Sequence, residues 1–491
     1  MATQMKISEM ARMLRTHEVS SRELTRSYID AIDAEDEKIG AFLTRTDDIA
    51  LETSDLADKA IAAGESLPPL AGIPCAIKDN IVTCGVRTTC ASRMLKDYVP
   101  PYDAHVIELL KAQLSPMLGK LNMDEFAMGS STENSAMKPV HNPRSLDRVP
   151  GGSSGGSAAA IAAREAAYTL GSDTGGSIRQ PAAFCGVVGM KPTYGAVSRY
   201  GLIAFASSLD QIGPFTADVE SNAIVLSAIV GHDKHDATSI PHESPDYTRS
   251  IEGGVHGMKV ALPTEFLQEG ISPQVRAGVM HAADALRAQG AQIEEVSMPI
   301  LKYALPAYYV ISSAEASSNL SRFDGVKYGY RAKNFETLDE LYTRSRTEGF
   351  GAEVKRRIML GSFALSSGYY DAYYKKALQV RTLISRAYDE VFGKFDLILS
   401  PVAPTTAYKA GEKSSSLEMY MGDIYTVPVN IAGLPALSMP CAKSDEGLPI
   451  GIQLIGPHFS EQKIYRAGLA LEKAVGTYDE IESRTAQGGD R

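Results

Sequence analysis

The 491-residue sequence has no tryptophan and only five cysteines. An odd, sparse set of cysteines without a CxxC pair is unlike a disulfide framework, and nothing beside Cys84 and Cys90 completes a zinc site. No run of about 18 apolar residues is present, which excludes a membrane span. The first residues, MATQMKISEMARML, lack the basic segment and apolar core of a secretory signal. We therefore expect a soluble cytoplasmic protein with reduced cysteines and no metal site.

Basic residues are fewer than acidic ones, with 49 Lys and Arg against 59 Asp and Glu and a formal net charge of -10. This balance argues against a protein that binds nucleic acid alone through a broad basic face, although a partner could supply that face. The hydrophobic share of 44% and the charged share of 22% are typical of globular proteins and exclude disorder for most of the chain. The length fits two to four domains or one large enzyme fold.

Short-range patterns predict both helices and strands in the first 120 residues. Ser20 and Glu23 have the spacing of a capping box, and apolar residues follow on one helical face. A second helix is expected at about 48–63. The apolar stretch 70–77 predicts a short buried strand that ends at Lys78. A further helix is expected at 103–112 and a further strand at 117–118.

The segment 151–195 is rich in glycine and serine: GGSSGGSAAAIAAREAAYTLGSDTGGSIRQPAAFCGVVGMKPTYG. Flexible linkers share this composition. However, the alanine-rich stretch between the two Gly/Ser clusters predicts a buried helix that leads into a strand at 166–170, and flexible linkers carry no such helix. We therefore expect the glycines to lie where the backbone approaches other atoms too closely for a side chain.

Strands and helices also alternate in the remaining sequence, which predicts a layered α/β fold. No internal repeat and no composition break marks a linker. The predicted elements are a strand within 256–266, a helix and a strand within 272–296, tyrosine-rich helices at 303–390, strands at 395–401, 436–442 and 449–456, and a helix at 462–475.

Three familiar catalytic patterns match in part. Residues 152–156 fit the G-x-S-x-G nucleophile elbow, but that site needs a late histidine, and the last third of the chain has only His458. The Asp-Thr-Gly at 173–175 is typical of an aspartic-protease loop, yet no second copy exists. The S-x-x-K at 135–138 lacks the companion motifs of that enzyme class. None of them decides the function.

A lysine and two serines carry a chemically complete alternative. Ser153 and Ser177 are framed by glycines at turn-like positions, and Lys78 ends the predicted buried strand. Gly175 and Gly176 would free consecutive backbone N–H groups to stabilise an oxyanion. A serine nucleophile without a histidine needs another base, and a desolvated lysine is neutral near pH 7. A surface lysine would match the sequence equally well, because spacing alone does not bring the three residues together.

The segments GGSSGGSAAAIAA and GSDTGGSIRQPAAFCGVVGMKPTYG resemble the long signature of the amidase family. The resemblance implies a Ser-cisSer-Lys triad, with Ser177 as the nucleophile, Ser153 as the bridging cis-serine and Lys78 as the base. It also implies an oxyanion hole made of backbone N–H groups, here those of Thr174, Gly175 and Gly176.

The same resemblance implies a single amidase-signature domain over residues 1–491, with a mixed central β-sheet covered by helices on both faces. Within it we expect a helical N-terminal region at about 1–65 and the signature core at about 66–215. A helix-rich, tyrosine-rich lobe follows at about 300–390, and closing strands and a helix at about 391–476.

Segments outside the signature, among them NMDEFAMGSSTENSA and MGDIYTVPVNIAGLPALSMP, resemble the glutaminase (A) subunits of tRNA-dependent amidotransferases over about residues 5–475. One segment, QLSPMLGKLN at 113–122, departs from the usual pattern of those subunits. The resemblance implies glutamine as substrate, bound by Tyr308, Arg357 and Asp423. Arg356 and Tyr309 are the neighbouring alternatives to Arg357 and Tyr308.

The resemblance also implies partners. Ammonia would pass to a B subunit that uses ATP and Mg²⁺ to amidate Glu-tRNA(Gln) or Asp-tRNA(Asn), and a small C subunit would complete a heterotrimer. No cofactor is expected in this chain, and tRNA is expected to bind mainly the B subunit. Two alternatives remain open at this point: a stand-alone amidase that acts on other amides, and a non-catalytic assembly subunit.

Overall fold

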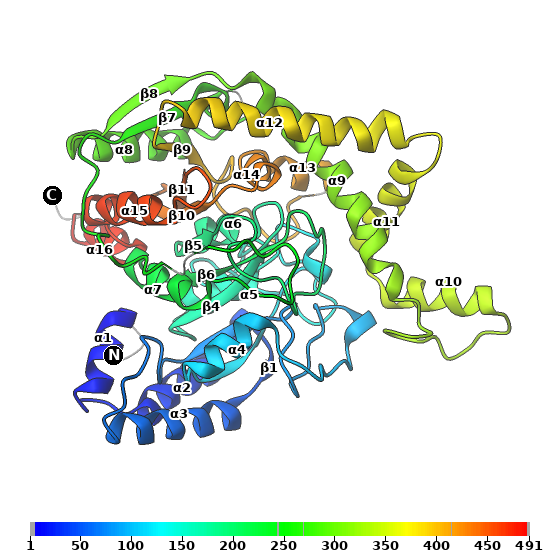
Figure 1. Ribbon diagram of the computed structural model, residues 1–491, viewed down its shortest axis with the longest axis horizontal. Helices are drawn as coiled ribbons and strands as arrows, with labels where there is room; N and C mark the ends of the chain where they lie inside the picture. The colour runs from blue at the N-terminus through cyan, green and yellow to red at the C-terminus, as the bar shows by residue number, and fades with distance from the viewer. Residues whose placement is uncertain (1–4, 243–244, 269, 414, 489–491) are drawn as a thin grey trace.

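The computed structural model of the protein describes residues 5–242, 245–268, 270–413 and 415–488. These residues form one 11-stranded sheet in the order β1-β3-β2-β4-β6-β5-β10-β11-β9-β7-β8, so that neighbours in space are often distant in the sequence (Figure 1). The strands are β1 Phe42–Arg45, β2 Cys75–Lys78, β3 Met117–Leu121, β4 Tyr168–Asp173, β5 Val188–Lys191, β6 Gln211–Thr216, β7 Lys259–Pro263, β8 Gln292–Val296, β9 Leu397–Pro401, β10 Ala436–Lys443 and β11 Pro449–Ile455.

The sheet is mixed, as predicted. Strand β2 is parallel to both β3 and β4, and β7 is parallel to both β8 and β9. The other neighbouring strands are antiparallel, including β10 with β5 and with β11. The parallel pairs need long crossover connections, which the intervening helices and loops supply.

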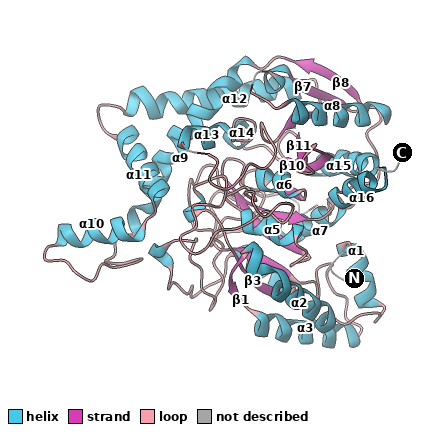
Figure 2. Cartoon of the chain, turned by 180° about the vertical axis from the view of Figure 1, so that it is seen from behind, coloured by secondary structure: helices cyan, strands magenta, loops and turns pink. Residues whose placement is uncertain are grey.

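Helices cover both faces of the sheet, as strand β11 demonstrates. Successive residues of a strand point to opposite faces. Ile450 packs on Gly278 of α8 (Pro273–Ala288), and Gly451 packs on Ala183 of α6 (Arg179–Cys185). The two helices therefore lie on opposite faces, and Figure 2 shows from behind how helices surround the strands. This arrangement confirms the predicted fold class.

The N-terminal region has the predicted helices and one strand that the pattern did not indicate. Ser20 and Glu23 form the capping box of α2 (Ser21–Ile39), and α3 spans Asp47–Ala62. Between them lies β1, whose pairing with β3 places Phe42 opposite Leu121. Four residues carry too little periodicity to reveal a strand that depends on a partner 79 positions away.

The strand predicted at 70–77 is shorter than expected. Only Cys75–Lys78 is extended, because Gly72 has a φ of +75° and the preceding residues form turns. The segment 113–122, whose sequence departs from the usual pattern of the A subunits, forms a regular strand. Strand β3 starts after Pro116 and lies between β1 and β2. Lys120 of β3 is fully buried and donates to the Ile81 carbonyl at 2.7 Å. The unusual sequence is therefore accommodated without displacing Lys78.

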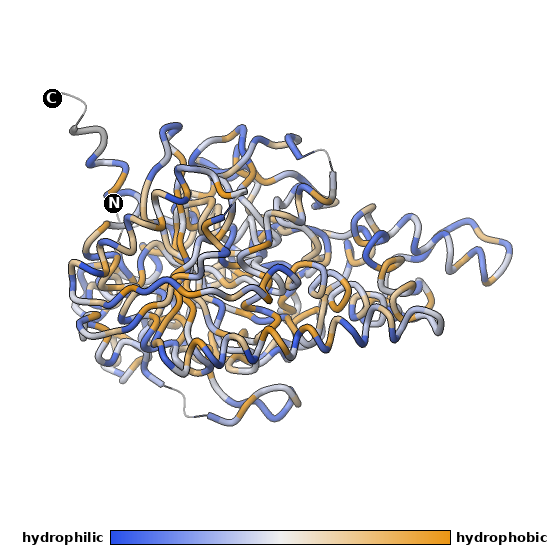
Figure 3. Tube along the Cα trace, turned by 90° about the horizontal axis from the view of Figure 1, so that it is seen from above, coloured by the Kyte–Doolittle hydropathy of each residue, from blue (hydrophilic) through white to orange (hydrophobic). Residues whose placement is uncertain are grey.

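The predicted tyrosine-rich helical lobe is an arm that projects from the side of the sheet (Figures 1 and 2). It is built by α9 (Ala304–Asn319), α10 (Leu338–Gly349), α11 (Ala352–Leu365), a π-helical turn (Tyr370–Lys375) and the start of α12 (Lys376–Phe392). Hydrophobic and hydrophilic stretches alternate along the arm in Figure 3. Helices α9 and α11 pack side by side, and α12 returns to the body, where it packs on α14.

The other helices complete the layers. The helices predicted at 103–112 and 462–475 are confirmed as α4 and α15. No described helix is long and apolar enough to cross a membrane, and all five cysteines are free. The remaining bounds are α1 Ile7–Arg15, α4 His105–Ala112, α5 Gly155–Ala162, α7 Val219–Ile229, α13 Ser416–Met421, α14 Val427–Ala432, α15 Glu461–Val475 and α16 Tyr478–Gly488.

Candidate active site

Lys78, the last residue of β2, lies fully buried among serine hydroxyls. Its Nζ atom is 2.8 Å from Ser153 Oγ, 2.7 Å from Ser154 Oγ and 3.0 Å from Ser172 Oγ. Burial lowers the pKa of Lys78 to about 7, since desolvation outweighs the attraction of the nearby carboxylates. A lysine held in this way is neutral in a large fraction of molecules near neutral pH and is available as a base.

Ser153 follows a cis peptide bond from Gly152, in the turn that leads into α5. The turn is held by Asp124, whose backbone N–H donates to the Ser153 carbonyl at 3.1 Å and whose carboxylate accepts the N–H of Thr132 at 2.9 Å. A Cβ atom on Gly152 would lie 2.2 Å from Asp124 Oδ2. Glycine is therefore required here by a close approach, as expected for this segment.

Ser177 lies in the loop between β4 and α6 and lines a pocket together with Gly175. Its carbonyl accepts the N–H of Ser154 at 3.3 Å, which holds the two serine segments side by side. Among the described residues, no hydrogen-bond partner is found for the Ser177 hydroxyl. The structure thus places Lys78 and Ser153 in direct contact, and it places Ser177 beside them at the pocket wall.

The backbone donors predicted for the oxyanion hole differ in their availability. The N–H of Gly176 donates to Asp173 Oδ1 at 2.8 Å and is therefore occupied. For the N–H groups of Thr174 and Gly175, no acceptor is found in the described part of the chain. Gly176 has a φ of +134°, and a Cβ atom there would lie 2.3 Å from Thr426 Oγ1, so both conformation and space require glycine.

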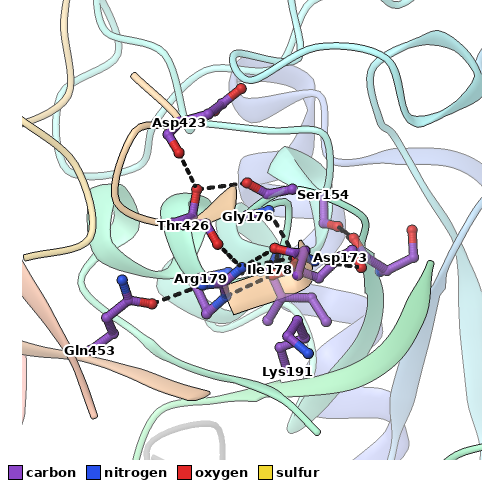
Figure 4. Close-up of polar contacts among 12 residues, drawn as sticks. Ser154, Asp173, Gly176, Ile178, Arg179, Lys191, Asp423, Thr426 and Gln453 are labelled. Atoms are coloured by element: carbon purple, nitrogen blue, oxygen red, sulfur yellow. Dashed lines mark hydrogen bonds and ion pairs between the residues drawn. The ribbon is translucent and has the colours of Figure 1, made fainter. Parts of the chain in front are cut away.

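A buried ion pair fixes the loop that carries Ser177 (Figure 4). Arg179 Nε donates to Asp173 Oδ2 at 3.1 Å, and Asn430 Nδ2 donates to Asp173 Oδ1 at 2.8 Å. Arg179 also reaches Gln453 Oε1 at 2.8 Å. Burial would raise the pKa of Asp173, but the Arg179 guanidinium outweighs it and lowers the pKa to about 2. The carboxylate thus stays charged, and the loop is tied to α14 and β11.

This network was not predicted from the sequence. The signal was present, because Asp173 and Arg179 are two opposite charges six residues apart in a segment otherwise made of small and apolar residues. Such charges are rarely buried unless they are paired. Asn430 and Gln453, by contrast, had no local signal, since only the sheet and α14 bring them to the loop.

The pocket beside Ser177 contains a buried cation. Arg357 of α11 is 3% exposed, and its guanidinium carbon lies 4.4 Å and 4.7 Å from the ring centroids of Tyr309 and Tyr420. Its Nε donates to Glu353 Oε1 at 2.7 Å, whereas no hydrogen-bond partner of its buried Nη1 is found in the described part of the chain. Arg356 does not line the pocket and pairs instead with Glu353 from a half-exposed position.

The same pocket contains an acidic group. Tyr309 donates its hydroxyl to Asp423 Oδ2 at 2.7 Å. Desolvation raises the pKa of Asp423 to about 7, although the hydrogen bond from Tyr309 and the charge of Arg357 oppose the shift. Tyr308 also lines the pocket, and its hydroxyl lies 2.4 Å from where a Cβ atom on Gly175 would be. The structure therefore brings all three predicted substrate residues to the pocket and adds Tyr309.

An amidase family model matches residues 23–465. The chain belongs to the amidase family. The A subunit of a glutamyl-tRNA(Gln) amidotransferase from Caldanaerobacter subterraneus subsp. tengcongensis is 57% identical over 486 residues, which cover 99% of both chains. The corresponding protein of Geobacillus kaustophilus is 57% identical over 470 residues, or 96% of this chain and 97% of the relative. The resemblance to the amidase family that the sequence indicated is thus confirmed.

Solved structures of this family have the same fold. The crystal structure of the glutamyl-tRNA(Gln) amidotransferase A subunit from Thermotoga maritima is 43% identical, with a TM-score of 0.80 over 96% of this chain and 95% of that one. A 6-aminohexanoate cyclic dimer hydrolase is 26% identical, with a TM-score of 0.83 over 97% and 98% of the two chains. Proteins named for different substrates therefore share this fold, so the fold alone does not identify the substrate.

Proposed function

We propose that this chain hydrolyses glutamine and delivers the ammonia to a partner subunit that amidates tRNA-bound glutamate or aspartate. One observation carries the proposal: the pocket beside Ser177 is lined both by Asp423 and by the buried Arg357, whose Nη1 has no hydrogen-bond partner among the described residues. An amide substrate that carries its own carboxylate and ammonium, as glutamine does, satisfies both groups. The relatives named as amidotransferase A subunits support the same substrate.

The proposed chemistry starts with a proton relay. Neutral Lys78 accepts the Ser153 hydroxyl proton, Ser153 accepts the proton of Ser177, and Ser177 Oγ attacks the side-chain amide carbon of glutamine. The C–N bond breaks after the relay returns a proton to the nitrogen, which leaves as ammonia. Water then attacks the glutamyl ester, with the same relay as base, to release glutamate. The relay requires contact between the Ser153 and Ser177 hydroxyls; in the described structure Ser153 Oγ accepts a hydrogen bond from Lys78 Nζ, and no partner of Ser177 Oγ is found among the described residues.

The negative charge of the tetrahedral intermediate needs donors at the pocket wall. We assign this role to the backbone N–H groups of Thr174 and Gly175, for which the described chain offers no acceptor. The N–H of Gly176 already donates to Asp173 and could bind the oxyanion only after it breaks that hydrogen bond. We therefore expect Gly176 to contribute less to the oxyanion hole than Thr174 and Gly175. Each donor of this kind is worth about 2.7–4 kcal/mol in other enzymes.

The other steps are proposed for partners. ATP and Mg²⁺ would be used by a B subunit that binds the misacylated Glu-tRNA(Gln) or Asp-tRNA(Asn), and a C subunit would complete the heterotrimer in the cytoplasm. The outer face of the arm fits such assembly: Phe363 and Tyr373 form an exposed aromatic cluster with Tyr369, and the adjacent Met359 is 71% exposed. Exposed apolar patches of this kind mark surfaces that a partner protein covers.

The deciding experiment compares the isolated chain with the chain copurified with its B and C partners. We expect glutamine hydrolysis in both, and tRNA amidation with glutamine only in the complex. When Ser177 is replaced by alanine, the complex should no longer amidate tRNA with glutamine as the nitrogen source, while ammonia should still support amidation. A stand-alone amidase would hydrolyse simple amides better than glutamine, and a non-catalytic assembly subunit would leave amidation unaffected by the Ser177 variant.

A further inference from the structure

Arg357 forms an ion pair with the carboxylate of Glu353, which does not itself line the pocket. Glu353 lies one helical turn earlier on α11 and is 5% exposed. Its Oε1 accepts hydrogen bonds from Arg357 Nε and from the Tyr420 hydroxyl, both at 2.7 Å. Its Oε2 pairs with Arg356. Three donors thus converge on one buried carboxylate at the edge of the pocket.

This arrangement fixes the direction of the guanidinium. Residues four apart on a helix share a face, so Glu353 engages the Nε side of Arg357, while Nη1 has no hydrogen-bond partner among the described residues. The rings of Tyr309 and Tyr420 lie against the guanidinium and restrict its remaining movement. A planar guanidinium held on one side presents its other N–H groups in a defined direction, which suits recognition of a carboxylate.

The anchors also keep two opposite charges apart. Arg357 and Asp423 line the same pocket, yet no ion pair joins them in the described structure. Arg357 is held by Glu353, and Asp423 is held by the Tyr309 hydroxyl. An Arg357 released from Glu353 would be free to turn toward Asp423, and the two groups would then neutralise each other rather than a zwitterionic substrate.

We propose that Glu353 is a positioning residue for substrate selection: it holds the Arg357 guanidinium toward the α-carboxylate of the substrate and away from Asp423. Tyr420 supports it by connecting α13 to the same carboxylate. This inference rests on the proposed glutaminase function. It assigns to Glu353 no contact with the substrate, so its removal should change affinity for charged substrates without changing the chemistry at Ser177.

The test uses the complete chain with Glu353→Gln, which keeps the size and an acceptor but removes the charge. Two substrates are compared: glutamine, and butanamide, which is glutamine without its α-ammonium and α-carboxylate. We expect the KM for glutamine to rise about tenfold, with kcat within about twofold, and kcat/KM for butanamide to stay within about twofold. Calorimetric binding of both amides in a Ser177→Ala background gives the same comparison independently of turnover.

Two further variants separate positioning from stability. Tyr420→Phe keeps the ring over Arg357 but removes the hydrogen bond to Glu353, and we expect a smaller rise in the glutamine KM, about threefold. Arg12→Ala removes an arginine from an exposed ion pair with Glu18, outside the pocket, and serves as the matched control with wild-type kinetics. Equal losses for glutamine and butanamide in Glu353→Gln, or a glutamine KM that does not change, would overturn the inference.

The outcome is distinguishable from failure of the proposed function. Absence of Ser177-dependent glutamine hydrolysis in the wild-type chain and in its complex would reject the glutaminase function itself. Wild-type hydrolysis together with an unchanged KM in Glu353→Gln would reject only the role of Glu353. Thermal unfolding of Glu353→Gln near the wild-type temperature shows that any kinetic change does not come from a loss of folded protein.

Discussion

The Nζ atom of Lys78 lies 2.8 Å from the Oγ atom of Ser153, although the two residues are 75 positions apart in the chain. The contact depends on the parallel pairing of β2 with β4, which aligns Ile77 with Leu170 and places the ends of both strands at the same edge of the sheet, where the turn before α5 carries Ser153. Because the pair is fully buried, the lysine has few ways to be solvated as a cation. The relay proposed for glutamine hydrolysis therefore depends on sheet topology as much as on the three side chains.

Replacing Lys78 with arginine should abolish glutamine hydrolysis even though the positive charge remains. A guanidinium cannot lose its proton near neutral pH, whereas the pKa of Lys78 lies at about 7. The wild-type kcat should rise as the pH increases through about 7, because the base works only after it loses its proton. Steady-state kinetics between pH 5.5 and 9 in about half-unit steps check both statements. Substantial turnover by Lys78→Arg would assign the lysine a structural role.

Ser177→Ala should abolish hydrolysis, whereas Ser154→Ala should retain part of it. Both serines are buried, but only Ser177 lines the pocket. Ser154 Oγ accepts a hydrogen bond from Lys78 Nζ at 2.7 Å, so its loss should lower kcat by about tenfold or less, in keeping with one ordinary hydrogen bond. Mass spectrometry of the trapped glutamyl enzyme checks the assignment, and an adduct on Ser154 would contradict it.

Asp423→Asn should weaken glutamine binding and leave simple amides nearly unaffected. The loss of one partner of a desolvated charge pair costs about 2–5 kcal/mol, so the KM for glutamine should rise at least about tenfold. Butanamide lacks the ammonium and should keep its kcat/KM. If both substrates lose equally, Asp423 supports the fold rather than the substrate.

The pH dependence of kcat/KM gives an independent check on Asp423. Its pKa is raised to about 7, and only the ionised carboxylate attracts an ammonium. Glutamine affinity should therefore fall as the pH decreases through 7, in addition to the loss of neutral Lys78. The logarithm of kcat/KM should fall with a slope near two in the wild type and near one in Asp423→Asn. Equal slopes in the two proteins would contradict the role of Asp423.

Arg179→Met should destabilise the protein as well as abolish activity. The variant leaves the carboxylate of Asp173 buried without its cation, a change that costs about 3–5 kcal/mol. Urea denaturation measures the free energy of unfolding. The matched control is Arg12→Met, which removes an exposed pair with Glu18 and should leave the free energy of unfolding nearly unchanged. A similar decrease in the free energy of unfolding in both variants would show that the buried pair stabilises the protein no more than an exposed pair does.

Transfer RNA should bind the isolated chain weakly and bind the complex in a salt-dependent way. A chain with a net charge of -10 repels the phosphate backbone overall, because its 59 acidic residues outnumber its 49 lysines and arginines. Filter binding at about 50 and 200 mM salt, with and without the B subunit, tests the division of labour. Tight and salt-sensitive binding by the isolated chain would contradict it.

The sequence was sufficient to predict those helices whose formation depends on residues close to one another in the chain. The capping box at Ser20 and Glu23 and the helix at Asp47–Ala62 follow from local spacing, and the structure has both. The triad residues could be assigned only because the signature segment is long and specific. Strand β1 and the short extent of β2 escaped prediction, because pairing with a distant strand and a turn at Gly72 decide them.

For the pocket residues, too, packing between distant parts of the chain decided what the sequence alone could not. The sequence left Arg356 and Arg357 open as alternatives, since both are basic and adjacent. The orientation of α11 places Arg357 in the pocket wall and leaves Arg356 half exposed, which favours Arg357 for the proposed role. Glu353 and Tyr420 had no signal at all: they belong to different helices, and their hydrogen bond exists only after the arm packs against the body.

The position of β10 and β11 in the middle of the sheet has a consequence for protein synthesis. These strands come late in the chain but lie between β5 and β9, and the pocket also needs Tyr420 and Asp423. A nascent chain that has already released the segment of Ser177 from the ribosome therefore still lacks one wall of the pocket and the strands that close the sheet. We therefore expect a chain synthesised only as far as α12 to release no ammonia from glutamine, because the pocket and the sheet are complete only once β11 has been made.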